Sequence, residues 1–181
     1  LPILLTAADA LPAEMVTYLT ALPVNTPVIT IVGGTSVVSS AVFEALDDLN
    51  GTAAVTRIAG ANRYATALAV ATETLPTGTH EVILATGLTA ADALSAGPRA
   101  AASGWPIILN DGDSLRSDVA AWIISAGITG VTIVGGESAV PASVSSELSN
   151  TYGINVTRMN GTNRDHTAAK IAAAVNTFAA I

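Results

Sequence analysis

The sequence predicts a doubly wound α/β fold, in which a mostly parallel sheet carries helices on both faces. Two observations lead to this prediction. Short apolar runs rich in Val and Ile alternate with Ala-rich stretches of helical length, which is the pattern of successive strand–helix units. The apolar runs are also continuous rather than alternating, so both faces of the strands should be buried. Half of the 181 residues are hydrophobic, which provides for a sizeable aliphatic core.

The elements follow from this alternation in chain order. Strands are expected at Ile3–Leu5, Val28–Val32, Val55–Ala59, Val82–Ala85, Ile107–Leu109, Val131–Val134 and Val156–Met159. Helices are expected at Pro12–Ala21, Ser39–Leu49, Arg63–Leu75, Ala91–Ala102, Ser114–Ser125, Pro141–Ser149 and Asp165–Ala180. The third to sixth of these strands should lie in one parallel sheet.

Polar and glycine residues mark where the helices begin. Asn62 is well placed as the N-cap of the helix at Arg63–Leu75. Thr89 and Asp92 have the spacing of a capping box before the next helix. A pair of glycines follows each "IVGG" strand and should form a turn, with Ser36 and Ser138 helping to cap the helices beyond.

Long segments of the sequence occur twice. "RIAGANRYATALAVA" begins at Arg57, and "RMNGTNRDHTAAKIA" begins 101 residues later. "LPILLTAADAL" likewise matches "WPIILNDGDSL", and "ITIVGGTSVVSSAVFEAL" matches "VTIVGGESAVPASVSSEL". Residues 1–54 are therefore interpreted as the C-terminal part of one repeat, 55–155 as a complete repeat, and 156–181 as the N-terminal unit of the next. The last segment is expected to pack with residues 1–54 as a second module.

Charge and composition exclude several classes of protein. The net charge of −7 argues against a nucleic-acid partner, because phosphate binding needs a basic face. The absence of cysteine excludes disulfides and thiolate sites. No apolar run has the length of a membrane span, so no membrane insertion is expected. The chain begins inside an apolar segment, which is typical of a fragment, and it shows no signal peptide.

Four of the seven basic residues, Arg57, Arg63, Arg158 and Arg164, lie in the duplicated motif. The second arginine of each copy falls at the first helical position, where a cation opposes the helix dipole. It therefore needs a nearby anion. That anion is either a carboxylate of the protein, with Asp92 as the leading candidate, or a bound anion from a ligand.

No catalytic or cofactor motif is present. The Gly pairs lack the spacing of either nucleotide-binding fingerprint, and no G-x-S-x-G elbow occurs. His80 and His166 have no metal-ligand spacing. Asp111 and Asp113 resemble the start of a calcium loop, but the remaining ligands are missing. We expect no catalytic residues, no metal site and no cofactor.

On these duplicated segments the chain resembles the cell wall binding repeat 2 family of Gram-positive surface proteins and wall hydrolases. The resemblance covers essentially the whole chain and implies Toprim-like modules that occur in tandem. It also implies a secreted, non-enzymatic module that anchors a protein at the cell wall by noncovalent binding of an anionic secondary wall polymer or wall glycan. Further partners would be other repeats of the same protein, or copies of it in a homo-oligomer.

The resemblance extends to particular residues. The P-I-L-L segment associated with polymer binding in the family falls on Ile3, Leu4 and Leu5, with a second copy at Ile107, Ile108 and Leu109, although these also have the pattern of buried strand residues. The full set of candidate binding residues is Arg57, Asn62, Arg63, Asp92, Arg158, Asn163, Arg164, Ile3, Leu4, Leu5, Ile107, Ile108 and Leu109.

Some features depart from the family pattern, and other functions stay open. The second motif copy has Asp165-His166 where the first has Tyr64-Ala65. The acidic net charge would repel an anionic polymer, so binding would need a local arginine patch, divalent cations or sugar contacts. One alternative is a structural spacer or oligomerisation repeat. A more remote one is a small phosphoryl-handling enzyme with Asp92 as a metal ligand, by analogy with the Toprim fold.

Overall fold

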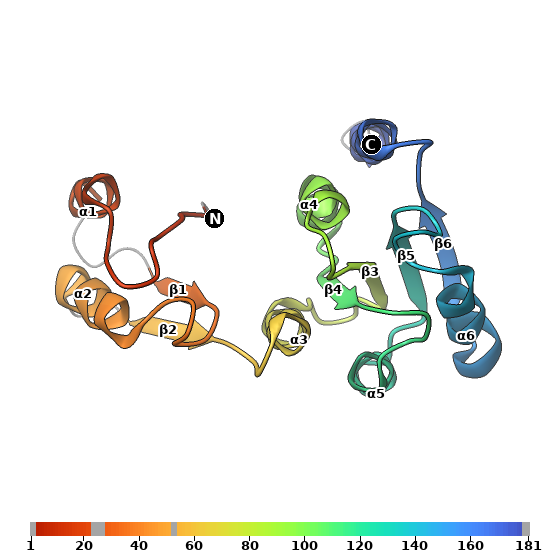
Figure 1. Ribbon diagram of the computed structural model, residues 1–181, viewed down its shortest axis with the longest axis horizontal. Helices are drawn as coiled ribbons and strands as arrows, with labels where there is room; N and C mark the ends of the chain where they lie inside the picture. Colours follow the sequence, from red (N-terminus) through yellow and green to blue (C-terminus); the bar gives the residue numbers. More distant parts are fainter. Residues whose placement is uncertain (1–2, 23–27, 52–53, 179–181) are drawn as a thin grey trace. The chain divides into compact units, whose positions relative to one another are not determined.

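The computed structural model in Figure 1 describes residues 3–22, 28–51 and 54–178. Their contacts divide the chain into two compact units, unit 1 (Leu1–Asn62) and unit 2 (Arg63–Ile181). Each unit has its own buried cluster of apolar side chains. None of the described helices is long and apolar enough to cross a membrane.

Unit 2 contains a four-stranded sheet with the order β4-β3-β5-β6, and every neighbouring pair is parallel. The strands are β3 (Glu81–Thr86), β4 (Ile107–Asn110), β5 (Gly130–Val134) and β6 (Asn155–Met159). The central strands are the most completely buried, as their unbroken apolar sequences predict. Val82, Ile83, Leu84 and Ala85 of β3 have no exposed surface.

Helices cover both faces of this sheet, which confirms the predicted fold class (Figure 1). One face carries α3 (Arg63–Thr74), α5 (Ser117–Ser125) and α6 (Ala142–Tyr152), whose apolar side chains pack with Leu84 and Ile133. The other carries α4 (Ala91–Ser103) and α7 (Arg164–Phe178), which pack on Ile83 and Val134. Alternate residues of one strand thus face the two layers.

Unit 1 repeats part of this arrangement. Strands β1 (Ile29–Val32) and β2 (Val55–Ile58) form a parallel pair, and α1 (Ala13–Thr20) and α2 (Ser40–Asn50) accompany them. Its core is built around Ile31, Val42 and Leu46. Ile31 lies opposite Arg57 in the β1–β2 register, and Ile133 lies opposite Arg158 in the β5–β6 register. The duplicated segments therefore fold in the same register.

Two of the strand predictions are wrong. Ile3, Leu4 and Leu5 form no strand. Their counterparts in β4 are paired with β3, whereas no described residue of unit 1 forms a strand equivalent to β3. The strand expected at residues 55–59 does not join β3, β4 and β5 either. It pairs with β1, and β6 takes the fourth place in the sheet.

Some helix starts also differ from the prediction. Ser36 and Ser138 lie in turns, and the helices begin later, at Ser40 and Ala142. The cap of α2 is Ser39, whose hydroxyl accepts a hydrogen bond from the Val42 amide at 3.4 Å. The capping box at Thr89 is absent, because α4 has Ala90 at its N-cap position and no side chain caps it.

The last strand and helix belong to unit 2, where β6 pairs with β5 and α7 packs on α4. The repeat bounds at residues 1–54, 55–155 and 156–181 stay a prediction, as does the packing of residues 156–181 with residues 1–54.

Candidate binding site at the carboxyl edge of the sheet

The first arginine of each motif copy binds a turn in the main chain. Arg57 Nη1 donates a hydrogen bond to the Gly33 carbonyl at 2.7 Å, and Arg158 Nη1 donates to the Gly135 carbonyl at 2.9 Å. Both acceptors are the first glycine of an "IVGG" turn, and both glycines have positive φ, 124° and 109°. The arginine therefore fixes the loop that leaves the preceding strand.

The surroundings of these two arginines differ. Arg57 lies over the Phe43 ring, 5.9 Å from its centroid, whereas Arg158 Nη2 donates to the Ser145 hydroxyl at 3.0 Å. Burial lowers the pKa of the Arg158 guanidinium, and the charge of Glu137 opposes that effect. A polar hollow of about 300 Å³ opens beside Arg158, lined by Ser145, Ser146, Ser149, Asn150, Val156 and Arg158.

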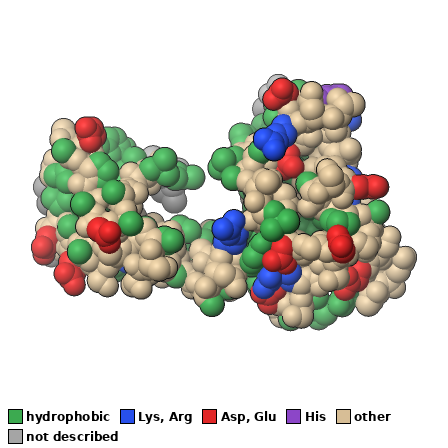
Figure 2. Space-filling view, viewed as in Figure 1, with side chains coloured by type: hydrophobic (Ala, Val, Ile, Leu, Met, Phe, Trp, Pro, Cys, Tyr) green, Lys and Arg blue, Asp and Glu red, His purple; other side chains and the backbone are tan. Residues whose placement is uncertain are grey.

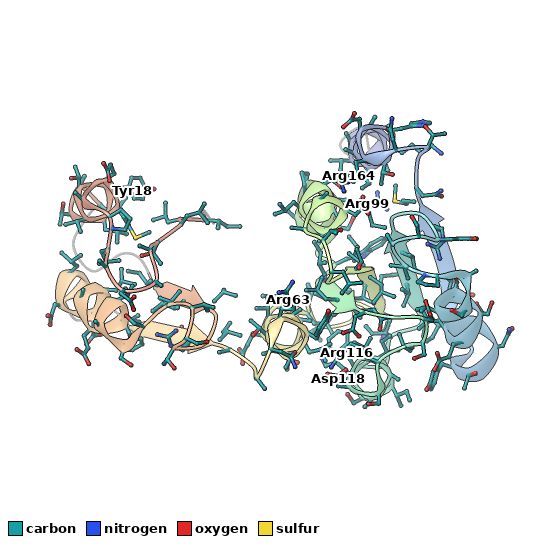
Figure 3. All side chains as sticks on the ribbon, in the orientation of Figure 1. Tyr18, Arg63, Arg99, Arg116, Asp118 and Arg164 are labelled. Atoms are coloured by element: carbon teal, nitrogen blue, oxygen red, sulfur yellow. The ribbon has the colours of Figure 1, made fainter. Side chains whose placement is uncertain are left out.

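Arg63 and Arg164 are the first residues of α3 and α7, as predicted, and both are exposed (Figure 3). Arg63 Nη1 donates to the Gly87 carbonyl at 2.9 Å, next to the end of β3. Within residues 3–22, 28–51 and 54–178, neither arginine lies within ion-pair distance of a carboxylate. The predicted structural ion pair with Asp92 is therefore wrong, because a main-chain carbonyl takes the place of the carboxylate at Arg63.

Asp92 lies elsewhere at the same edge, in the first turn of α4. A Cβ atom added to Gly135 would come 2.7 Å from its Oδ2, so the carboxylate lies directly against that turn. This places Asp92 between the ends of β3 and β5. The strand that follows β3 in the sequence lies on one side of it, and β5 lies on the other side, so the strand order changes direction here. Open α/β sheets commonly bind ligands at such a point.

Asn62 and Asn163 precede the two arginine-initiated helices. The Asn163 side-chain oxygen accepts a hydrogen bond from the His166 amide at 2.8 Å, so Asn163 is the N-cap of α7. Asn62 occupies the equivalent position before α3. The cap expected at Asn62 stays a prediction, and the structure adds a cap at Asn163 that the sequence analysis did not name.

A charged cluster that the sequence did not indicate lies at the same edge, beside Tyr64. Arg116 forms ion pairs with Asp111 at 3.1 Å and with Asp118 at 2.9 Å. Its guanidinium also lies 4.3 Å from the centroid of the Tyr64 ring. Burial and a hydrogen bond to Asp111 raise the pKa of Tyr64, while the bond from Arg116 lowers the pKa of Asp118. Figure 3 shows Arg116 and Asp118 together at the start of α5.

One signal could have revealed this cluster. Arg116 has acidic residues five positions before it and two positions after it, at Asp111 and Asp118. The contact of this cluster with Tyr64, however, depends on the packing of α3 against β4, which are far apart in the sequence. No local pattern predicts such a contact.

The apolar candidate residues differ in burial between the two copies. Ile108 is fully buried in β4, with Ile107 and Leu109 half-buried beside it. Ile3 and Leu5 are 89% and 86% exposed in the irregular segment of unit 1, and Leu4 is 43% exposed. In unit 2 these residues serve the core, whereas in unit 1 they form an open apolar surface.

The visible surface carries no continuous basic face, because Lys and Arg side chains appear as small separate patches among carboxylates (Figure 2). Across the described part of the chain, no three His, Asp or Glu side chains come together in a way that could hold a metal ion. The edge of the sheet therefore offers arginines, amides and hydroxyls, which are donors suited to an anion or a sugar.

Residues 57–145 match the sequence model of the family described as cell wall binding domain 2 (CWB2). Residues 57–145 are a CWB2 domain. The match spans the first motif copy and the strands and helices of unit 2 through the start of α6. It identifies a cell wall binding module, which is a non-catalytic domain that acts at the cell surface.

Relatives of known name agree with this assignment. The chain is 34% identical over 97% of its length to the N-acetylmuramoyl-L-alanine amidase LytC of Bacillus subtilis (strain 168), and it spans 33% of that protein. Its fold matches the solved structures of Cwp6 and Cwp8 from Clostridium difficile, with TM-scores of 0.86 and 0.79 and identities of 26% and 33%. The matches cover 99% and 94% of this chain but 28% of each solved chain.

Proposed function

We propose that this CWB2 chain holds a protein at the cell surface by noncovalent binding of an anionic secondary wall polymer. The membership in a cell wall binding family carries the proposal. The polymer would contact the carboxyl edge of the unit 2 sheet, where Arg63 and Arg164 begin their helices with exposed guanidinium groups. A polymer anion there would offset the unfavourable interaction between each cation and its helix dipole.

The net charge of −7 requires that this attraction be local. At physiological salt the Debye length is about 8 Å, so an anion in contact with Arg63 experiences mainly the charges near it. Polymer hydroxyl groups could add hydrogen bonds to the serine-lined hollow beside Arg158. We therefore expect binding that weakens as salt rises and that depends on a few arginines rather than on the total charge.

Sedimentation with purified cell walls tests the proposal. The full chain should sediment with untreated walls and lose most of its binding when the anionic polymers have been extracted. Arg164→Gln should weaken binding severalfold. Lys170→Gln is the matched control, because it removes the same charge from an exposed site on the same helix.

The outcomes separate the alternatives. Equal binding to extracted walls would contradict the anionic polymer and favour wall glycan as the ligand. Equal loss in Arg164→Gln and Lys170→Gln would point to unspecific charge attraction. No binding to any wall preparation would favour the spacer or oligomerisation role. The phosphoryl-handling alternative has no group of potential metal ligands in the described residues to support it.

A further inference from the structure

A polar hollow of about 300 Å³ opens in unit 2 where α6 lies beside β6 (Figure 1). Its lining is uncharged apart from one guanidinium group, and consists of Ser145, Ser146, Ser149, Asn150, Val156 and Arg158. The volume is at the lower end of the range for ligand sites, which is about 300–1,000 Å³. The hollow therefore suits one small polar molecule, or one unit of a polymer.

Arg158 gives the hollow a cation with unused donors. Two of its five N–H groups are engaged, by the Gly135 carbonyl at 2.9 Å and the Ser145 hydroxyl at 3.0 Å. No ion pair to Arg158 occurs among the described residues, although the charge of Glu137 acts on it. The guanidinium is half-buried and these bonds hold it in place, so a ligand anion would meet a charged donor that is already oriented.

The side chains of α6 add hydrogen-bonding groups of both kinds. Because Ser145 accepts from Arg158, its own hydroxyl hydrogen stays available to a ligand. Ser149 donates its hydroxyl hydrogen to the Ser145 carbonyl at 2.8 Å, which leaves the Ser149 oxygen as an acceptor. The Asn150 amide can donate and accept. Sugar hydroxyl groups also donate and accept, so this lining is suited to a sugar.

Unit 1 has the same elements at this place but a different lining. The duplicated segments align Phe43 with Ser145, and Arg57 with Arg158. The centroid of the Phe43 ring lies 5.9 Å from the Arg57 guanidinium, so the ring takes the place of the serine hydroxyl. The remaining polar lining residues of α6 all have acidic counterparts in α2, namely Glu44, Asp47 and Asp48. These carboxylates would repel an anion, so the hollow of unit 2 has no equivalent site in unit 1.

We propose that the hollow between α6 and β6 binds a single sugar unit that carries a phosphate or carboxylate group. The anionic group would bind the unused N–H groups of Arg158, and the sugar hydroxyls would bind Ser145, Ser149 and Asn150. The site rests on the proposed function only for the source of the sugar, which is either a unit of the wall polymer or a free sugar. The exposed arginines at the helix starts take no part in it.

Titration of the full chain with glucose 6-phosphate, followed by amide NMR, tests the site. The amides of residues 145–150 and 156–158 should shift in a saturable manner, with a dissociation constant in the millimolar range expected of one sugar unit. Glucose alone and inorganic phosphate alone should each bind at least about tenfold more weakly, because each offers only part of the recognised groups. Glucuronate should bind like glucose 6-phosphate.

Two variants introduce unit 1 residues into the hollow. Asn150→Asp places a carboxylate where unit 1 has Asp48, and it should weaken the binding of glucose 6-phosphate by at least about tenfold. Ser145→Phe should fill the space and abolish the binding. Thr151→Asp is the matched control, because it adds the same charge at an exposed position of the same helix outside the hollow. The control should bind glucose 6-phosphate like the unmodified chain.

An absence of shifts at these amides would overturn the proposal. Equal weakening by Asn150→Asp and Thr151→Asp would also overturn it, as would equal affinity for inorganic phosphate and glucose 6-phosphate. Sedimentation with cell walls then identifies the source of the sugar. If Asn150→Asp loses wall binding together with glucose 6-phosphate binding, the source is the polymer, and if it keeps wall binding, the source is a free sugar. An unmodified chain that binds no wall would contradict the proposed function and leave the NMR result unaffected.

Discussion

At the scale of single residues, the four motif arginines divide into two roles. Arg57 and Arg158 extend from strands β2 and β6 and hold the carbonyl of a glycine turn. Arg63 and Arg164 begin helices and remain exposed. The first pair therefore stabilises the fold. The second pair lies at the surface, where the proposed polymer would contact it, although Arg63 also donates to the Gly87 carbonyl. Substitutions should separate the two roles.

Arg158→Met should destabilise unit 2 by about 1.5–3 kcal/mol, because it removes charge-assisted hydrogen bonds to Gly135 and Ser145. Arg164→Met should change stability by no more than about 0.5 kcal/mol, since the residue is exposed. Urea unfolding followed by tryptophan fluorescence measures both, as the two tryptophans, Trp105 and Trp122, lie in unit 2. Equal shifts for the two variants would contradict the division of roles.

The pair of Arg116 and Asp118 makes stability depend on pH in the acid range. The hydrogen bond from Arg116 lowers the pKa of Asp118 in the folded state. A carboxyl group with a lowered pKa contributes stability above its unfolded pKa of about 3.9, and the contribution is lost as pH falls through the folded value. Asp118→Asn should therefore make the free energy of unfolding depend less on pH below about pH 4.

Urea midpoints measured at a series of pH values from neutral to acid test this effect. Glu73→Gln is a suitable control, because Glu73 is exposed at the end of α3 and no ion pair to it occurs among the described residues. A wild-type profile that matches the Asp118→Asn profile over the acid range would contradict the effect. The difference should be modest, since the Asp118 side chain is 39% exposed and the pair is screened by solvent.

At the scale of elements, α3 is fixed to the sheet of unit 2 through Tyr64 and Gly87. Gly87 follows β3, and a Cβ atom at this position would collide with the Tyr64 ring. The absence of a side chain therefore lets α3 approach the edge at which Arg63 and Arg116 lie. The glycine is required for space, since its φ is not positive.

Gly87→Ala should cost about 1–3 kcal/mol of unit 2 stability through overpacking against Tyr64. Gly97→Ala is the control, because no atom lies within 4 Å of its added Cβ and alanine favours the helix. In a Tyr64→Ala background the cost of Gly87→Ala should fall by more than about 0.5 kcal/mol. An unchanged cost in that background would show that the ring is not the obstacle.

The packing of α7 on α4 makes a second prediction at this scale. Ile171 of α7 is 1% exposed and packs in the cluster with Ile83, Ala96 and Val134. Ile171→Ala should therefore destabilise unit 2 by about 2–5 kcal/mol. Leu94→Ala, at a position of α4 that is 75% exposed, should stay within about 0.5 kcal/mol of the wild type. Thermal unfolding that ranks the two variants equally would contradict this packing.

At the scale of the whole chain, the two units differ in how completely they are built. In the part of the chain that the structure describes, unit 2 has a four-stranded sheet with two helical layers, whereas unit 1 has a two-stranded sheet and a small core. A two-stranded sheet is marginally stable on its own. The amides of Val42 and Leu46 should therefore lose exchange protection at urea concentrations where tryptophan fluorescence still reports a native unit 2. Coincident transitions would show that the units unfold together.

The sequence alone predicts the fold class and most elements, because strand–helix alternation and continuous apolar strands are local patterns. It also identifies the family, since the duplicated segments are specific to it. The helix-initial position of Arg63 follows from local rules in the same way.

Pairing between distant segments was decided only in the tertiary structure. Ile3–Leu5 and Ile107–Leu109 have nearly the same sequence, yet only the second is a strand, because β3 pairs with it. Arg63 donates to the Gly87 carbonyl rather than to Asp92, and Arg116 contacts the Tyr64 ring. Both contacts exist because α3 packs on the sheet of unit 2. A strand forms only where a second strand supplies hydrogen bonds, and the contacts of a charged side chain depend on which elements pack around it. Neither is specified by the residues beside it in the chain.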